Sequence, residues 1–345
     1  MRRAFFLIVI IVAALGLVSI AVINTRAGQD FVLARMIDVV MRRTPTPPPE
    51  GGLRVFMCGT SSPLPAPNRA QACVGVMADD RLYIVDAGAG SPGVASLGGL
   101  PLENLRALLL THFHSDHIAA AGDFNLLSWV AGRSRPLEVV GPEGVERVVS
   151  GLNELYALDR SYRVAHHGAG FMPPELHELA ARTIQPGVVL DDAGLEITAF
   201  TVDHSPVTPA VGYRFDYGGR SVVITGDTIV TEGLVEAARD ADLLLSDAIS
   251  LPIVRALEKG AHAAGRERQA KILRDIQDYH ASTSSLADAA QRAGVRKLAL
   301  YHLVPAPRNA LMEKIFMRDM EDGTVLTEDG MIFDLPADRT EVIVR

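Results

Sequence analysis

Hydrophobic and polar positions in residues 53–345 form short apolar runs separated by longer mixed stretches. The short runs, bounded by Gly, Pro, Asn and Asp, predict β-strands over residues 53–57, 72–77, 81–86, 105–110, 137–140, 195–202, 211–217, 221–224 and 297–300. Helices are predicted over residues 144–152, 231–238, 266–280 and 284–293. This mixture predicts sheets covered by helices in one large α/β domain.

The first 43 residues follow a different pattern. Residues Ala4 to Ile23 are apolar apart from one glycine and one serine, and two arginines precede them. A bilayer span takes about 20 residues. A cleaved signal peptide is the alternative, but its apolar region is usually about 7–15 residues and ends at a cleavage site of small residues. We therefore expect one uncleaved N-terminal transmembrane helix, a signal anchor that leaves a membrane-anchored body in the periplasm or another extracytoplasmic space.

A proline-rich segment follows this apolar region. Residues 44–52, TPTPPPEGG, have the composition of a short, stiff, extended spacer. The expected organisation is an anchor and juxtamembrane segment over residues 1–43, a linker over residues 44–52, and one large domain over residues 53–345.

Charge and cysteine content limit the function of this domain. Residues 44–345 hold 27 basic and 39 acidic side chains, a formal charge of −12, and show no basic run, so a nucleic-acid substrate is not expected. Cys58 and Cys73 are the only cysteines, and a metal site must therefore use histidine and carboxylate ligands. These two cysteines should lie on neighbouring strands; we expect buried free thiols, with an oxidised pair as the alternative.

Residues 111–117, THFHSDH, follow an apolar strand directly. His112, His114 and Asp116 recur with a period of two, so an extended segment would aim all three to one side and His117 elsewhere. A single histidine is more often a surface or satisfied core residue, but burying this many polar groups without a metal would be costly. The spacing therefore favours two metal ions close together.

Four side chains cannot complete two metal sites, so further ligands are expected after later strands. The candidates are His204, Asp227 and His302. A carboxylate such as Asp227 can bridge two cations, which a neutral imidazole cannot. Mixed histidine and carboxylate ligands favour two Zn²⁺ ions, with Mn²⁺ or Fe²⁺ as alternatives.

The THFHSDH motif resembles the signature of the metallo-β-lactamase superfamily, and residues 84–90, IVDAGAG, resemble the aspartate block that precedes it. The resemblance narrows to the ribonuclease Z and arylsulfatase-like branch through CGTSSPLPAPNRA (58–70), DHSPVTPAVGYRF (203–215), ITGDT (224–228) and YHASTSSLADAAQRAGVRKLALYHLVP (279–305). It implies an αββα four-layer sandwich.

The resemblance also implies roles for individual residues. One metal would take His112, His114 and His204, and the other Asp116, His117 and His302, with Asp227 bridging the pair. Asp86 resembles the aspartate that braces the histidine loop. His280 resembles the histidine that assists the leaving group, and Asp247 would be its supporting acid; the alternative is that His280 is an ordinary helix-end histidine.

This sequence also departs from the branch. Ribonuclease Z has a His-Glu-Ala-Thr block, but residues 246–249 read SDAI here. Ribonuclease Z also has a glycine- and proline-rich basic arm, whereas residues 152–179 are too mixed for a polyanion clamp. Within this stretch, His166 and His167 either line the substrate pocket or are ordinary loop residues. His177 and His262 are expected to be solvated.

The function expected from these features is hydrolysis of a small ester, a phosphodiester or a sulfate ester. Two divalent cations make hydroxide available near neutral pH, Asp116 would orient it, and His280 would protonate the departing oxygen. The alternatives are ribonuclease Z-type tRNA 3′ processing, a lactonase or carboxylesterase, and a non-enzymatic metal-binding scaffold. The expected partners are the ester substrate and, through the N-terminal helix, a membrane; a homodimer is left open.

Overall fold

The structure is a computed structural model of the 345-residue chain, and it describes residues 5–6, 10, 15–16, 19–42 and 47–345. The chain divides into two compact units, Met1–Thr46 and Pro47–Arg345. In the first unit, helix α2 (Arg26–Met41) begins after Thr25, whose side chain accepts a hydrogen bond from the Gly28 amide and so caps the helix. None of the residues of α2 is buried.

The N-terminal transmembrane helix expected from the sequence is not found. Among the described residues, no helix is both long enough and apolar enough to cross a membrane. This finding overturns the expectation of a transmembrane helix, and with it the expectations of a membrane partner and of a membrane-anchored, extracytoplasmic body. Much of the apolar range 4–23 lies outside the described residues.

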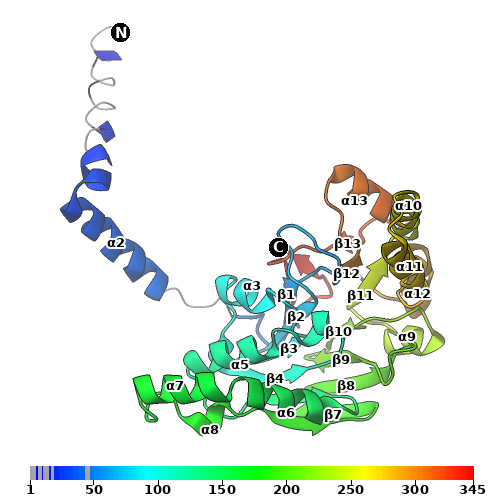
Figure 1. The fold of residues 1–345 in the computed structure, drawn as a ribbon, viewed down its shortest axis with the longest axis horizontal. Helices are drawn as coiled ribbons and strands as arrows, with labels where there is room; N and C mark the ends of the chain where they lie inside the picture. Colours follow the sequence, from blue (N-terminus) through cyan, green and yellow to red (C-terminus); the bar gives the residue numbers. More distant parts are fainter. Residues whose placement is uncertain (1–4, 7–9, 11–14, 17–18, 43–46) are drawn as a thin grey trace. The chain divides into compact units, whose positions relative to one another are not determined.

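Two β-sheets make up the centre of the second unit (Figure 1). The strand order in the first sheet is β15 (Ile343–Val344), β14 (Ile332–Leu335), β1 (Leu53–Gly59), β2 (Cys73–Ala78), β3 (Arg81–Val85), β4 (Leu105–Leu109), β5 (Glu138–Gly141) and β6 (Ala180–Thr183). The order in the second sheet is β13 (Val325–Leu326), β12 (Leu298–Val304), β11 (Leu243–Ile249), β10 (Arg220–Ile224), β9 (Val211–Tyr217), β8 (Leu195–Thr201) and β7 (Gly187–Asp192).

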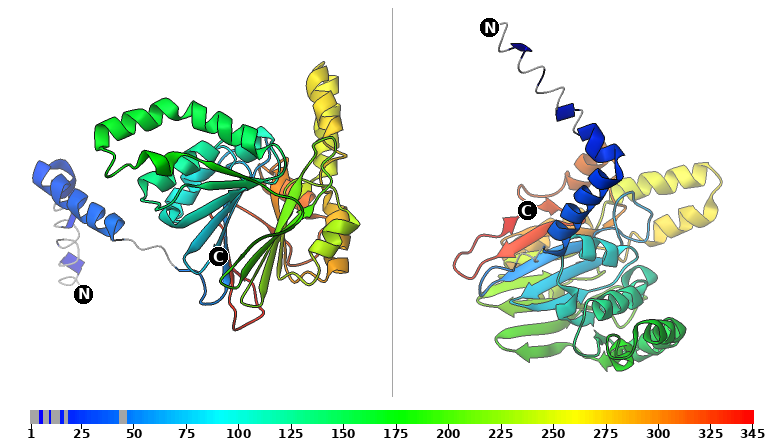
Figure 2. Two further views of the ribbon diagram at one scale, coloured as in Figure 1. Left: turned by 90° about the horizontal axis from the view of Figure 1, so that it is seen from below. Right: turned by 90° about the vertical axis from the view of Figure 1, so that its left-hand side faces the viewer.

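Helices cover the outer face of each sheet (Figure 2). On the first sheet they are α3 (Ser91–Leu97), α5 (Ala121–Val130) and α6 (Val145–Leu155), together with the short helices η1 (Leu102–Asn104) and α4 (Ser115–Ile118), and α7 (Ala157–His167) and α8 (Pro174–His177) pack against α5 and α6. On the second sheet they are α9 (Glu232–Ala237), α12 (Thr283–Ala293), α13 (Ala310–Met317) and the start of α10 (Leu251–Ala263). Helices α10 and α11 (Glu267–Asp275) form a hairpin that extends beyond the sheet (Figure 2).

Apolar side chains fill three layers between these elements. Val76 and Tyr213 belong to the layer between the two sheets. Phe124 of α5 packs with Leu108 beneath the helices of the first sheet, and Leu286 of α12 packs in the corresponding layer of the second. Because each layer removes apolar surface from water, the two sheets and their helices hold together as the αββα sandwich that the family resemblance implies.

Several elements are absent from the sequence prediction. The most consequential is β11, the third strand of the second sheet, whose seven residues are all buried. Its sequence, LLLSDAI, breaks the apolar run with Ser246 and Asp247, which obscures the strand signal. Helix α11 also ends at Asp275, five residues before the predicted end at His280, so His280 lies in an irregular segment between two helices.

The two cysteines form a disulfide rather than the expected free thiols. Cys58 of β1 and Cys73 of β2 are both buried, and their sulfur atoms are bonded. The strands pair so that Cys73 lies opposite Gly59, which brings the two side chains together at the end of the ladder. The disulfide therefore ties the start of the loop over residues 60–72 to its end.

Candidate metal centre

Histidine and aspartate side chains converge where strands of both sheets end. The histidine loop, residues 110–114, follows β4 of the first sheet; His204 follows β8 and Asp227 follows β10 of the second. Asp247 and His302 lie within the last residues of the neighbouring strands β11 and β12. Because parallel strands present their carboxyl ends at the same edge of a sheet, these five sequence segments meet at one place.

The histidine loop is held by Asp86, which follows β3. Asp86 Oδ1 accepts a hydrogen bond from the Thr111 amide at 2.9 Å, and Oδ2 accepts one from His117 Nδ1 at 2.8 Å. Asp86 has a left-handed backbone, with φ 59°. Such a backbone costs about 1–3 kcal/mol at a residue other than glycine and persists only where its surroundings impose it. The two hydrogen bonds of Asp86 restrain both Thr111 and His117.

A first cluster consists of His112, His114, His204 and Asp227, whose candidate ligand atoms lie within 4.8 Å of one another. His204 Nε2 lies 3.4 Å from His114 Nδ1. The other ring nitrogen of His204, Nδ1, donates to the Tyr279 carbonyl at 2.9 Å, which orients Nε2 toward the cluster. Sequence reasoning did not assign this role to Tyr279, because a backbone carbonyl leaves no residue-type signal.

A second cluster consists of Asp116, His117 and His302, whose candidate ligand atoms also lie within 4.8 Å of one another. His302 Nε2 lies 3.0 Å from Asp116 Oδ2, and His117 Nε2 lies 3.5 Å from the same oxygen. Asp227 connects the two clusters: its Oδ2 lies 3.9 Å from His112 Nε2 and 3.4 Å from His117 Nε2. The structure thus brings together all seven residues that the sequence singles out as ligands.

The backbone geometry around these residues differs from the sequence prediction in one respect. The extended segment ends at His114, and α4 begins at Ser115, so Asp116 lies in a helical turn. It joins His117 and His302 in the second cluster instead of pointing with His112 and His114. The predicted period-two alternation of three ligands is therefore wrong for Asp116, because a helical turn rotates successive side chains by about 100°.

His302 reaches the site through an irregularity in β12. Asp247 pairs with Tyr301 and Ala248 pairs with Leu303, so His302 is the extra residue of a bulge between β11 and β12. Its φ is 43°, in the left-handed region. A bulge redirects a side chain that a regular strand would place elsewhere, and here the redirected side chain lies against Asp116 and Asp227.

Unsatisfied polar atoms provide a test of whether cations fit this site. Four buried ligand atoms have no hydrogen-bond partner among the described residues: His112 Nε2, His117 Nε2, His302 Nδ1 and one oxygen of Asp227. An unpaired buried polar group costs about 1–3 kcal/mol. Two divalent cations would satisfy such atoms, and the nitrogen and carboxylate donors match those of zinc sites. The residues present therefore fit a two-metal centre.

The ionisation of the first cluster is also suited to a cation. Burial lowers the pKa of His112 well below its usual value and lowers that of His204 to about 4, which keeps both imidazoles in the neutral, metal-binding form. Burial alone would raise the pKa of Asp227, but the neighbouring His302 and His117 hold it well below its usual range. Asp227 is therefore an anion that can offset the charge of bound cations.

A histidine–aspartate pair lies beside the two clusters. His280 Nδ1 is 2.9 Å from Asp247 Oδ2, and the His280 ring lies 5.4 Å from the rings of both His204 and His302. Burial lowers the pKa of His280 to about 4, and burial followed by the charge of Asp227 raises the pKa of Asp247 well above its usual value. Both shifts favour the uncharged form of each side chain.

The remaining histidines lie outside the two clusters. His166 and His167, the candidate substrate contacts, are exposed at the end of α7, and their ring centroids lie 4.6 Å apart in an edge-to-face arrangement. His262 is exposed, as expected. His177 is not solvated, contrary to expectation: it is 1% exposed and packs against Trp129, with ring centroids 4.7 Å apart.

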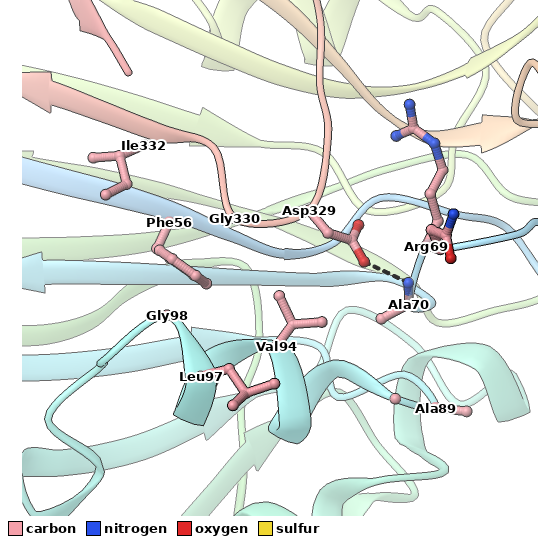
Figure 3. A pocket seen from close by; sticks show the side chains of 12 residues that line it. Phe56, Arg69, Ala70, Ala89, Val94, Leu97, Gly98, Asp329, Gly330 and Ile332 are labelled. Atoms are coloured by element: carbon pink, nitrogen blue, oxygen red, sulfur yellow. Dashed lines mark hydrogen bonds between the residues drawn. The ribbon is translucent and has the colours of Figure 1, made fainter. Parts of the chain in front are cut away.

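A hollow of about 690 Å³ lies beside β1 and α3 (Figure 3). Its charged side chains are already paired within the chain. Asp329 accepts hydrogen bonds from the amides of Thr60 and Ala70, and Arg69 donates to the Thr60 hydroxyl and the Thr327 carbonyl. These bonds hold the loop over residues 60–72, so the polar lining of this hollow has a structural explanation.

Comparison with known proteins identifies relatives of this chain. Residues 82–303 match the family described as a beta-lactamase superfamily domain. The chain is 38% identical over 259 residues to a protein named ribonuclease Z from Mycobacterium bovis, covering 74% of this chain and 87% of the relative. It is 36% identical over 259 residues to the ribonuclease Z of Mycobacterium marinum, with the same coverage.

The solved structures that resemble this fold include a bacterial and a human protein. The metallo-beta-lactamase fold protein YhfI from Bacillus subtilis aligns with a TM-score of 0.60 and 20% identity, covering 82% of this chain and 99% of that one. The short form of human tRNase Z aligns with a TM-score of 0.56 and 19% identity, again covering 82% and 99%. At this level of identity the likeness concerns the fold.

The relatives overturn one expectation about partners. The sequence argued against a nucleic-acid substrate from its charge of −12, yet the relatives at 36–38% identity are ribonucleases by name. Net charge is a weak guide here, because a local surface and bound cations decide whether a polyanion can approach.

Proposed function

Because the chain belongs to the ribonuclease Z branch of the metallo-β-lactamase superfamily, we propose that it is a tRNA 3′-processing endoribonuclease. It is a metal-dependent hydrolase that acts on ester bonds, and its family uses a dinuclear metal site. The observation that carries this proposal is the 38% identity to ribonuclease Z over 87% of the relative's length. The substrate bond would be a phosphodiester of RNA.

We assign the metal ligands as the resemblance implies. The first cluster would hold one cation and the second cluster the other, with Asp227 between them, and zinc fits the donor set best, with manganese or iron as alternatives. When bound, such a pair of cations supplies hydroxide at neutral pH and neutralises charge on a phosphoryl oxygen.

The chain's own residues would then do three things. Asp86 would fix the histidine loop through Thr111 and His117, and so fix the distance between the clusters. Asp116, 3.0 Å from His302, would orient the attacking oxygen as well as hold a cation. His280 would give a proton to the departing oxygen, with Asp247 holding its ring in place through Nδ1.

A small phosphodiester or sulfate ester is the second candidate substrate, and one observation favours it. The arginines of α7 are matched by acidic partners: Arg163 lies 2.8 Å from Asp159, and Arg160 lies 3.3 Å from Glu178. Residues 152–179 therefore present little free positive charge where ribonuclease Z has its basic arm. A small ester would not need such an arm.

A substrate comparison with the full chain separates the two candidates. The assay measures kcat/KM for a precursor tRNA carrying a 3′ trailer, for bis(p-nitrophenyl) phosphate and for p-nitrophenyl sulfate, with Asp227→Ala as the inactive control. We expect the precursor tRNA to be the best substrate and to be cut at one position. Turnover of the nitrophenyl esters without any cleavage of the tRNA would refute the RNA assignment and favour the small ester.

The metal is identified in the same preparations. Metal analysis of the purified chain should give about two equivalents of one divalent metal. Removal by a chelator followed by addition of Zn²⁺, Mn²⁺ or Fe²⁺ separately then shows which ion restores cleavage. Less than about one equivalent of metal with no hydrolysis of any ester would instead favour the scaffold alternative.

A further inference from the structure

A second hollow lies outside the metal centre, between α10, α11 and α13. Its volume is about 660 Å³, within the range of roughly 300–1,000 Å³ that is usual for ligand sites. Helices α10 and α11 form a hairpin that lies beside α13 (Figure 1). The walls are mainly apolar, and Leu257 and Ile272 remain 44% and 50% exposed there. We refer to this hollow as the hairpin groove.

One apolar cluster links the wall of the hairpin groove to the His280 side of the metal centre. Leu64 and Leu273 line the groove and also pack in one apolar cluster with Tyr279. The carbonyl of Tyr279 accepts the hydrogen bond from His204, and its ring lies 4.7 Å from the ring of His280. Tyr279 therefore contacts both the packing behind the groove wall and the residues beside the metal clusters.

Positive charge collects around this groove. The hairpin and the turn after it contain six basic and four acidic side chains: Arg255, Lys259, Arg266, Arg268, Lys271 and Arg274 against Glu258, Glu267, Asp275 and Asp278. Lys271 and Arg274 are paired with Asp275 and Glu258. Lys259, Arg266 and Arg268 are exposed and form no ion pair within the described part of the chain.

Arg308 adds a cation from a distant part of the sequence. It lines the groove together with Arg266 and donates a hydrogen bond to the Pro65 carbonyl, and its charge has no acidic partner among the residues described. The sequence shows no basic run because Lys259, Arg266, Arg268 and Arg308 are dispersed along it. The fold brings two of them, Arg266 and Arg308, to the lining of one apolar groove, in a body whose charge is otherwise strongly negative.

We propose that the hairpin groove is the docking site for the RNA strand on the His280 side of the cleaved bond. This inference rests on the proposed function and adds where the RNA lies. Phosphates would contact Arg266 and Arg308, which present planar guanidinium groups suited to phosphate oxygens. A base would lie against the apolar walls, as bases do on sequence-independent single-strand platforms. Charge complementarity thus selects a polyanion with flat apolar groups as the occupant.

Two variants of the full chain test this proposal in different ways. Arg266→Ala/Arg308→Ala removes the two cations that line the groove. Gly260→Phe fills the groove, and it should fold because a Cβ at Gly260 meets no atom within 4 Å. The control is Arg135→Ala, which removes one exposed cation just before the start of β5, at the end of the strands away from the histidine loop.

The measurements are KM and kcat for a precursor tRNA, and the binding of that RNA to the metal-loaded His280→Ala chain, alone and combined with each substitution, by fluorescence anisotropy at several salt concentrations. We expect a roughly tenfold higher KM for the double variant, and a salt slope smaller by about 1.4, since each single-strand phosphate contact contributes about 0.7. Gly260→Phe should raise KM at least as much. Arg135→Ala should behave as the unmodified chain.

The outcomes distinguish the two proposals. If the unmodified chain cuts the tRNA and both groove variants keep its KM and salt slope, the hairpin groove does not bind RNA while the proposed function stands. If the unmodified chain neither cuts nor binds the tRNA, the proposed function fails and the groove proposal fails with it. A raised KM in both groove variants, with the control unaffected, supports the docking site.

Discussion

Replacing His280 by alanine should affect two substrates very differently. In RNA the departing oxygen belongs to a ribose hydroxyl, which leaves poorly unless it receives a proton. In bis(p-nitrophenyl) phosphate the departing nitrophenolate is stable without one. The His280 ring lies 5.4 Å from the rings of His204 and His302, one from each cluster, so it is placed to serve the departing oxygen.

The expected size of the effect follows from the chemistry of proton donation. A positioned general acid contributes about 10²–10⁴ in rate, which at about 1.4 kcal/mol per factor of ten is about 3–5.5 kcal/mol of transition-state stabilisation. We therefore expect His280→Ala to lower kcat on precursor tRNA by about 10³ and kcat on bis(p-nitrophenyl) phosphate by less than about tenfold.

The assay is single-turnover cleavage of both substrates by chains of known metal content. Asp247→Asn is the companion variant, because it keeps the size of the side chain but removes the carboxylate 2.9 Å from His280. It should show a smaller loss in the same direction, greater on RNA than on the nitrophenyl ester. Metal content should stay at the unmodified level in both variants.

The reasoning would be refuted by an equal loss on both substrates with the metal retained, since a proton donor must discriminate between leaving groups. Loss of one metal in His280→Ala would instead indicate that His280 is a metal ligand rather than a proton donor. This outcome is open to test because the candidate ligand atoms of His280, Asp227, Asp247 and His302 lie within 4.8 Å of one another.

Three further predictions concern the metal centre, the disulfide and a buried histidine. Asp227→Ala should lower bound metal below two equivalents and kcat/KM by more than about 100-fold, measured by metal analysis and cleavage; full activity would contradict the bridged centre. Replacing Cys58 and Cys73 by serine releases a 15-residue loop and should lower the free energy of unfolding by about 3 kcal/mol, read from urea midpoints without reductant. An unchanged midpoint would argue against a stabilising disulfide. Burial lowers the pKa of His177 to about 4, so the unfolded chain binds its proton more readily and stability should fall as pH drops from about 6.5 toward 4. His177→Phe should reduce that loss in urea titrations at pH 7 and pH 5, and equal losses in both chains would exclude a contribution from His177.

The sequence predicts the strands around the site well because their signals are local. The strand before the histidine loop, predicted over residues 105–110, is β4 at Leu105–Leu109, and the strand predicted over residues 211–217 is β9 at Val211–Tyr217. The same local reasoning misses β11, because Ser246 and Asp247 interrupt its apolar run. They are tolerated there since Asp247 is paired with His280, which is 33 residues away in the sequence.

For the candidate site, too, the sequence predicts the features that depend on local residue types and misses those that depend on distant contacts. The motif at residues 111–117 is sufficient to indicate a metal centre, because the chemistry of its side chains is local to it. Which cluster Asp116 joins depends on the turn of α4, and where His302 points depends on a bulge that exists only when β11 and β12 pair. Neither can be read from residue types.

The sequence by itself determined the chemistry of this protein: histidine and carboxylate donors at strand ends, a superfamily signature, and hydrolysis as the reaction. Only the tertiary structure decided the arrangement, because it depends on contacts between distant segments. Asp227 lies 3.4 Å from His117 although 110 residues separate them, Cys58 and Cys73 meet only across a strand pair, and Arg266 and Arg308 line one groove only when α13 packs on the hairpin.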